Sequence, residues 1–135
     1  GSDGAKILQK YKMPREIIDI AQQHHGTTLL KYFYHKAKED GKLVKEAEYR
    51  YAGPKPQKKE TAVIAIADSV EAAVRSMKHP TADKIKEIVQ TIIKDKLHDG
   101  QFDECDLTLK ELKTVEHVLC ETLNGIFHSR IEYPQ

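Results

Sequence analysis

The fold is decided by the stretch KETAVIAIADSVEAAVRSM, which occupies residues 59–77. Small and apolar residues fill almost every position from Ala62 to Val74, a pattern typical of a helix that is buried on most of its surface. We therefore expect residues 59–77 to form a helix at the centre of the molecule. In the most apolar part of this run, residues 62–70 (AVIAIADSV), a single carboxylate, Asp68, interrupts the pattern.

Two further helices are predicted on the C-terminal side of this segment. Residues 79–81 (HPT) break the chain, and the next stretch carries a regular apolar stripe of helical period that ends at residues 99–100 (DG). Thr108 and Glu111 have the spacing of a capping box, which indicates the start of a last long helix.

Three shorter helices are predicted on the N-terminal side. Apolar residues at helical spacing indicate two short helices before Gly26 and a third that stops near residues 40–41 (DG). Residues 42–58 lose this period and contain Gly53 and two prolines, so we expect a loop there. No segment indicates a strand, and the predicted fold is all-α, a single bundle of about six helices.

Composition limits the classes of partner. The chain has 135 residues, of which 39% are hydrophobic, enough for one compact domain with a core. Lys and Arg number 22 against 21 Asp and Glu, so the net charge of +1 predicts no general attraction to DNA or to an anionic membrane. No apolar run approaches the ~20 residues that span a bilayer. Cys105 and Cys120 are expected as reduced thiols of a cytoplasmic domain.

Two adjacent histidines, His24 and His25, form the first candidate site, at the end of a predicted helix and directly before Gly26. Successive helical residues point about 100° apart, so two neighbouring imidazoles converge only where the helix ends and the backbone can turn. Neutral imidazole is a ligand for Mn, Fe, Zn and related ions. Two histidines at a helix C-terminus also suit the negative end of the helix dipole, and this alternative needs no metal.

Asp68 is the second candidate, because a carboxylate is costly to bury unless it is paired, hydrogen-bonded or bound to a cation. Metal ligation explains Asp68 as well as a structural ion pair or a helix face that is wetter than its composition suggests. Glu71 and Arg75 lie on roughly the same helix face. They could contact Asp68 and hold its carboxylate in position for a metal ion, or they could form a plain i,i+4 ion pair with each other.

The loop before the central helix is the third candidate, because it combines cationic and aromatic side chains with a rigid backbone. Arg50, Lys55 and Lys58 are suited to binding phosphate, and Tyr51 could stack on a base. A solvated loop, with the tyrosine packed against the protein, is the alternative.

No GxSxG, Walker A, GxGxxG or HExxH sequence is present, so serine hydrolases, P-loop hydrolases, Rossmann enzymes and zincins are unsupported. The chain instead resembles the HD domain of the seven-transmembrane HD proteins of the PgpH type, which are bacterial cyclic di-AMP phosphodiesterases. The segment RYxGPKP is the most specific part, because HD-GYP and other HD hydrolases share the double histidine without this loop. The matching stretches are residues 23–28 (QHHGTT), 32–34 (YFY), 49–57 (YRYAGPKPQ), 59–60 (KE), 67–72 (ADSVEA), 99–101 (DGQ), 107–110 (LTLK) and 128–134 (HSRIEYP).

The resemblance implies a centre of two divalent metal ions, with Mn or Fe preferred. His24 and His25 match the double histidine of the family, and Asp68 matches its late aspartate. The early histidine, the His-Asp pair that names the family and a further histidine have no counterpart here. Residues 1–2 (GS) are expected to remain from an expression tag. The resemblance implies that residues 3–135 are the C-terminal portion of an HD domain and that this piece alone is inactive.

The implied function is hydrolysis of cyclic di-AMP to the linear dinucleotide by the parent protein. The parent is expected to be anchored upstream in a bacterial inner membrane, with this domain in the cytoplasm. One alternative is a non-catalytic helical module for ligand sensing or protein interaction, and another is an HD hydrolase of a different nucleotide or phosphodiester. A homodimer is also expected, because helices missing from an HD domain would leave apolar surface exposed.

Overall fold

The computed structural model describes residues 1–131, with side chains described up to Phe127. Within these residues the chain is helical without any strand, and an isolated antiparallel bridge joins Leu29 to Arg50. The prediction of an all-α fold with about six helices is confirmed. The end of the stretch 128–134 lies outside the described residues. The elements are α1 (Ser2–Lys10), α2 (Arg15–Gln23), α3 (Lys31–Glu39), the short 3-10 helix η1 (Glu46–Tyr49), α4 (Lys59–Arg75), α5 (Ala82–His98) and α6 (Leu109–Ile131).

The long helices begin where the sequence signals predict. The Oγ1 atom of Thr81 accepts a hydrogen bond of 3.2 Å from the backbone N–H of Lys84, which caps α5. At the start of α6, the backbone N–H of Thr108 donates to Oε1 of Glu111, and the backbone N–H of Glu111 donates to Oγ1 of Thr108, each at 3.1 Å. This reciprocal pair is the predicted capping box.

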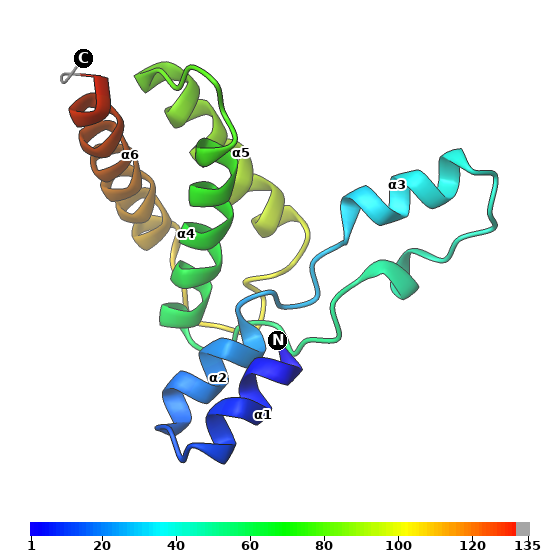
Figure 1. Ribbon diagram of the computed structural model, residues 1–135. Coiled ribbons are helices and arrows are strands. Elements are labelled where there is room, and N and C mark those ends of the chain that lie inside the picture. The colour runs from blue at the N-terminus through cyan, green and yellow to red at the C-terminus, as the bar shows by residue number, and fades with distance from the viewer. Residues whose placement is uncertain (132–135) are drawn as a thin grey trace.

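The helices form three groups in space. Helices α4, α5 and α6 stand side by side, and the α1–α2 pair packs against the N-terminal end of α4 (Figure 1). Helix α3 and η1 pack on each other and form an arm that extends away from the three long helices (Figure 1). Ala37 is the buried residue of α3, so this helix shares little with the core of the three long helices.

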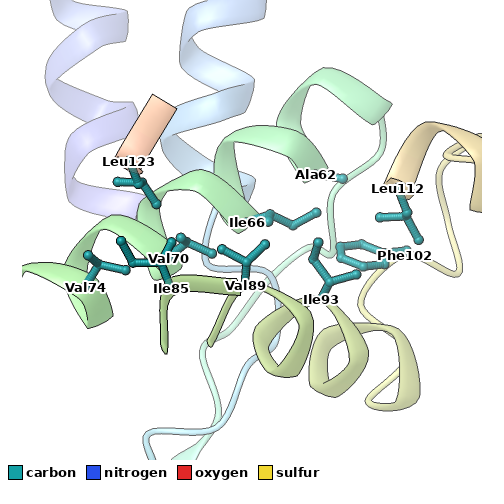
Figure 2. Packing of buried hydrophobic residues seen from close by; sticks show 10 residues of the cluster. All are labelled: Ala62, Ile66, Val70, Val74, Ile85, Val89, Ile93, Phe102, Leu112 and Leu123. Carbon is teal, nitrogen blue, oxygen red and sulfur yellow. The ribbon is translucent and has the colours of Figure 1, made fainter. Parts of the chain in front are cut away.

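The core lies between α4, α5 and α6. Its side chains interdigitate along the length of α4 and α5, with contributions from α6 and from the turn that precedes it (Figure 2). The buried members are Ala62, Ile66, Val70, Val74, Ile85, Val89, Ile93, Phe102, Leu112 and Leu123.

Helix α4 is less buried than its composition predicts. Ile66 is fully buried, whereas Ile64 is 38% exposed and Asp68 lies on the same open face. The expectation that α4 is buried on most of its surface is wrong for the described residues, and the wetter helix face considered for Asp68 describes that residue, which is exposed. The reason is geometric: the core shared with α5 and α6 lies along one side of α4, and Asp68 lies on the side away from that core.

The two isoleucines provide a test of this asymmetry. We expect Ile66→Ala to lower the free energy of unfolding by about 2–5 kcal/mol, because it removes buried methylene groups and leaves a cavity in the core. The matched control, Ile64→Ala, is expected to cost less than about 1 kcal/mol. Urea unfolding of the two variants measures the difference, and equal losses would show that both faces of α4 are covered in solution.

Candidate metal centre

The centre is built where α2 ends. His24 is the C-terminal cap of α2, and the following Gly26 adopts a positive φ of 53°. The backbone N–H of Gly26 donates to the carbonyl of Gln23 at 2.8 Å, which closes the turn. A Cβ atom at Gly26 would collide with Oε1 of Gln101, and side chains other than glycine's rarely adopt this φ, so the turn favours glycine.

The two imidazoles lie close together beyond this turn. Their ring centroids are 4.0 Å apart. Nδ1 of His24 donates to the carbonyls of Ile20 at 3.0 Å and Ala21 at 3.2 Å, which leaves Nε2 with a free lone pair. An imidazole oriented by backbone carbonyls through one nitrogen is ready to bind a cation through the other.

His25 is held by an aromatic contact. Its ring stacks on Tyr51 with a centroid separation of 4.5 Å and an interplanar angle of 9°. Partial burial, and then the neighbouring His24, lower the pKa of His25. Both effects favour the neutral imidazole, which is the form that binds a metal ion.

Asp68 completes a group with the two histidines. Each of the three residues offers one ligand atom, and these atoms lie within 4.8 Å of one another. Metal–ligand bonds of about 2.1 Å allow two ligand atoms on one ion to be up to about 4.2 Å apart. A small rotation of one side chain therefore suffices, and the donor set of two imidazoles and a carboxylate fits a divalent transition-metal ion.

Arg50 connects this turn to α5. Its guanidinium forms two hydrogen bonds to Asp99, at 2.9 and 3.0 Å, and one of 2.8 Å to Glu46. Nη1 of Arg50 also donates to the backbone carbonyl of Thr27 at 2.8 Å. Two carboxylates thus match the charge of Arg50, and its surroundings favour a structural role over the phosphate binding predicted for it.

Gln101 holds the other side of the same peptide segment. Its side chain is only 2% exposed, and its Oε1 accepts a 3.0 Å hydrogen bond from the backbone N–H of Thr27. Its Nε2 donates to Oγ1 of Thr27 at 3.0 Å and to Asp99 at 2.8 Å. Hydrogen bonds from Arg50 and then from Gln101 lower the pKa of Asp99. We call Arg50, Asp99 and Gln101 the Thr27 clamp, because together they bind both backbone groups of Thr27.

The remaining predicted residues divide by location. Lys55 is half-buried, and its charge adds to the lowering of the Asp99 pKa. Lys58 is exposed and lines a separate pocket of about 370 Å³ between α2 and the start of α4. Glu71 and Arg75 form an ion pair of 3.6 Å with each other, so the plain i,i+4 alternative describes them. The structure brings none of these four residues into the group formed by His24, His25 and Asp68.

Sequence reasoning missed Lys96. This residue lies at helical spacing from Ile92 on α5, and both line a pocket of about 620 Å³ that also reaches Ser69, the neighbour of Asp68. Burial, and then the charge of Lys31, lower the pKa of Lys96. A lysine within the apolar stripe of α5 was the available signal, since the stripe otherwise faces the core.

Curated relatives match nearly the whole chain. The cyclic-di-AMP phosphodiesterase PgpH of Bacillus subtilis (strain 168) is 63% identical over 134 residues, which is 99% of this chain. The cyclic-di-AMP phosphodiesterase PgpH of Listeria monocytogenes (strain 10403S) is 64% identical over 132 residues, 98% of this chain. The chain is therefore similar to one segment of these PgpH proteins. It spans about a fifth of the PgpH proteins it matches, 19% of the first and 18% of the second.

A crystal structure shows the same fold. The HD domain of the L. monocytogenes phosphodiesterase PgpH, solved in complex with cyclic-di-AMP, matches with a TM-score of 0.90 and 64% identity. The match covers 93% of this chain and 58% of the crystallised PgpH chain. No protein-family model matches the chain. The resemblance to PgpH-type HD domains predicted from the sequence is confirmed.

None of the helices among residues 1–131 has the length and hydrophobicity needed to cross a membrane.

Proposed function

We propose that the protein hydrolyses cyclic di-AMP to the linear dinucleotide, as a metal-dependent phosphodiesterase of the PgpH family. The observation that carries this proposal is the convergence of His24, His25 and Asp68. It occurs in a chain whose sequence is 64% identical to that of a PgpH HD domain with the same fold. In the reaction, oxygen from water bonds to phosphorus, the bond to one ribose oxygen of the ring breaks, and that oxygen takes up a proton.

We infer that the group of three residues contributes part of a centre for two divalent ions, with Mn or Fe preferred. When bound, such ions activate water as a nucleophile and neutralise charge on the phosphate. The chain's own residues orient the ligands: backbone carbonyls fix His24, the Tyr51 ring supports His25, and Asp68 projects from the open face of α4. We propose that the other ligands lie in the part of the HD domain outside this segment, and that the segment alone is inactive.

The proposal extends to location and assembly. We propose that the parent protein is anchored in a bacterial inner membrane and that this domain lies in the cytoplasm.

We also propose that the isolated chain self-associates, supported by exposed apolar side chains such as Ile17 at 42%, Ile64 at 38% and Leu43 at 105%. Sedimentation velocity tests this expectation, and a monomer at every concentration would contradict it.

The experiment that tests the activity uses the complete HD domain, since the L. monocytogenes relative was crystallised as an HD domain. The domain is loaded with Mn or Fe and incubated with cyclic di-AMP or cyclic di-GMP. We expect faster formation of linear product from cyclic di-AMP, and loss of the activity after chelation. Metal binding without cleavage of either dinucleotide would contradict the substrate, and cleavage of another phosphodiester alone would favour a different HD hydrolase.

A further inference from the structure

The pocket of about 370 Å³ between α2 and the start of α4 lies outside the candidate metal centre. None of the residues that line it belongs to the group formed by His24, His25 and Asp68. Its volume is within the range of small-molecule sites, which is about 300–1,000 Å³. The proposed hydrolysis makes no use of this pocket.

Two buried polar side chains form part of the pocket wall. Gln23 is 8% exposed and Thr61 is 2% exposed, and both line the pocket. Oε1 of Gln23 accepts a hydrogen bond of 3.1 Å from the backbone N–H of Gln57, so the other end of the amide, Nε2, is a donor. Among the side chains described up to Phe127, Nε2 of Gln23 and the Thr61 hydroxyl have no hydrogen-bond partner.

These two polar groups remain accessible from the pocket. Every side-chain nitrogen or oxygen atom that the described part of the chain buries completely has a hydrogen-bond partner. The unpartnered groups of Gln23 and Thr61 therefore keep part of the small accessible surface that these residues have at the pocket. A nearly buried donor without a partner is costly, so a ligand that offers an acceptor to Nε2 of Gln23 would be stabilised there.

Charges of both signs surround the same pocket. Glu16 and Glu60 are exposed carboxylates, and Lys58 is an exposed ammonium group. Asp19 also lines the pocket, but it pairs with Arg15 at 3.1 Å. Within the described residues, the side chains of Glu16, Lys58 and Glu60 form no ion pair or hydrogen bond. A ligand with a single charge would attract one sign and repel the other, whereas a zwitterion matches both.

We propose that this pocket binds a free α-amino acid with an apolar side chain. Its carboxylate accepts a hydrogen bond from Nε2 of Gln23 and pairs with Lys58, and its ammonium group pairs with Glu16 or Glu60. Hydrogen bonds with one ionised partner are roughly twice as strong as neutral ones. Ile20, which is partly buried and lines the pocket, provides the apolar contact. The inference goes beyond the proposed function and does not depend on it.

The test is calorimetric titration of the complete, metal-loaded HD domain with three compounds that share one apolar chain. L-Leucine has both charged groups, isopentylamine lacks the carboxylate, and isocaproate lacks the ammonium group. We expect saturable binding of leucine with a Kd of about 1 mM or lower, and binding of the other two at least about tenfold weaker. Equal affinity for leucine and either analogue would overturn the inference. Failure of leucine to bind would overturn it as well, since the pocket would then be closed in the complete domain.

Substitutions locate the binding within the domain. Thr61→Val keeps the shape of the buried side chain and removes its hydroxyl, and Lys58→Met removes the exposed cation. We expect each to weaken leucine binding by about tenfold, the loss of one hydrogen bond to a charged group. Lys94→Met, at an exposed lysine on α5, is the matched control and should leave the affinity unchanged. Circular dichroism checks that the Thr61 variant is folded.

Binding at the metal centre is the alternative, because amino acids also coordinate metal ions. In the Asp68→Asn variant, which removes a proposed metal ligand, we expect leucine to bind with unchanged affinity. If Asp68→Asn abolishes binding while Thr61→Val and Lys58→Met do not alter it, leucine occupies the metal centre and the inference fails. A domain that cleaves cyclic di-AMP without binding leucine overturns this inference alone, and one that binds leucine without cleaving any phosphodiester overturns the proposed function alone.

Discussion

Replacing His25 with alanine in the complete HD domain is expected to reduce cleavage of cyclic di-AMP by more than about a hundredfold. Loss of a residue that only orients a metal ligand costs about 10–100-fold in metal affinity or activity, and His25 is proposed as a ligand itself. The substitution also removes the ring that stacks on Tyr51 at 4.5 Å. Metal content after dialysis and the rate of linear-product formation should therefore fall together.

A matched histidine controls for general damage. His79 is exposed in the connection between α4 and α5, and His79→Ala is expected to leave both metal content and rate unchanged. Circular dichroism of the His25 variant should retain the helical spectrum. Full metal content and full activity in His25→Ala would remove this residue from the centre and leave the helix-dipole explanation for the double histidine.

Gln101→Ala is expected to weaken metal binding by about 10–100-fold although Gln101 is not a proposed ligand. The substitution removes the acceptor for the backbone N–H of Thr27 and the donor to Asp99, so one half of the Thr27 clamp is lost. A buried donor left without a partner costs about 1–3 kcal/mol of stability. Calorimetric titration with Mn and urea unfolding measure the two effects.

The control is another glutamine. Gln90 on α5 is exposed and donates to Glu116 at 2.6 Å, so Gln90→Ala should change stability by less than about 0.5 kcal/mol and leave metal affinity unaltered. Gln101→Glu refines the result, because it keeps an acceptor for Thr27 but introduces a carboxylate beside Asp99. If Gln101→Ala destabilises the fold but binds Mn normally, the clamp stabilises the chain without positioning the histidines.

The sequence predicted the helices and the central group because both depend on local signals. Helical period and caps such as Thr81 need only neighbouring residues, and the structure follows them. Each candidate ligand was recognised from its sequence neighbours alone. His24 and His25 are adjacent imidazoles at the end of a predicted helix, and Asp68 is a charged residue in an apolar run. The structure then brings these three residues together.

The errors concern information that no local pattern contains. Apolar composition predicted that α4 is buried on most of its surface, but burial depends on which elements pack against the helix, and its core contacts lie on one side. Phosphate binding by Arg50 stays a prediction, but its ion pair with Asp99 could not be foreseen, because Asp99 lies 49 positions away in the sequence. Lys96 was not singled out, since only the fold reveals that a pocket lies over it.

Helix α4 finally has a bearing on how sequences of this domain can diverge. Its core contacts fall on Ile66, Val70 and Val74, whereas Asp68 projects from the opposite side and takes no part in them. Selection for folding and selection for chemistry therefore act on different positions of one seventeen-residue helix. Mutations that alter the reaction can accumulate on one face without eroding the stability supplied by the other, so the two properties can evolve independently along the same segment.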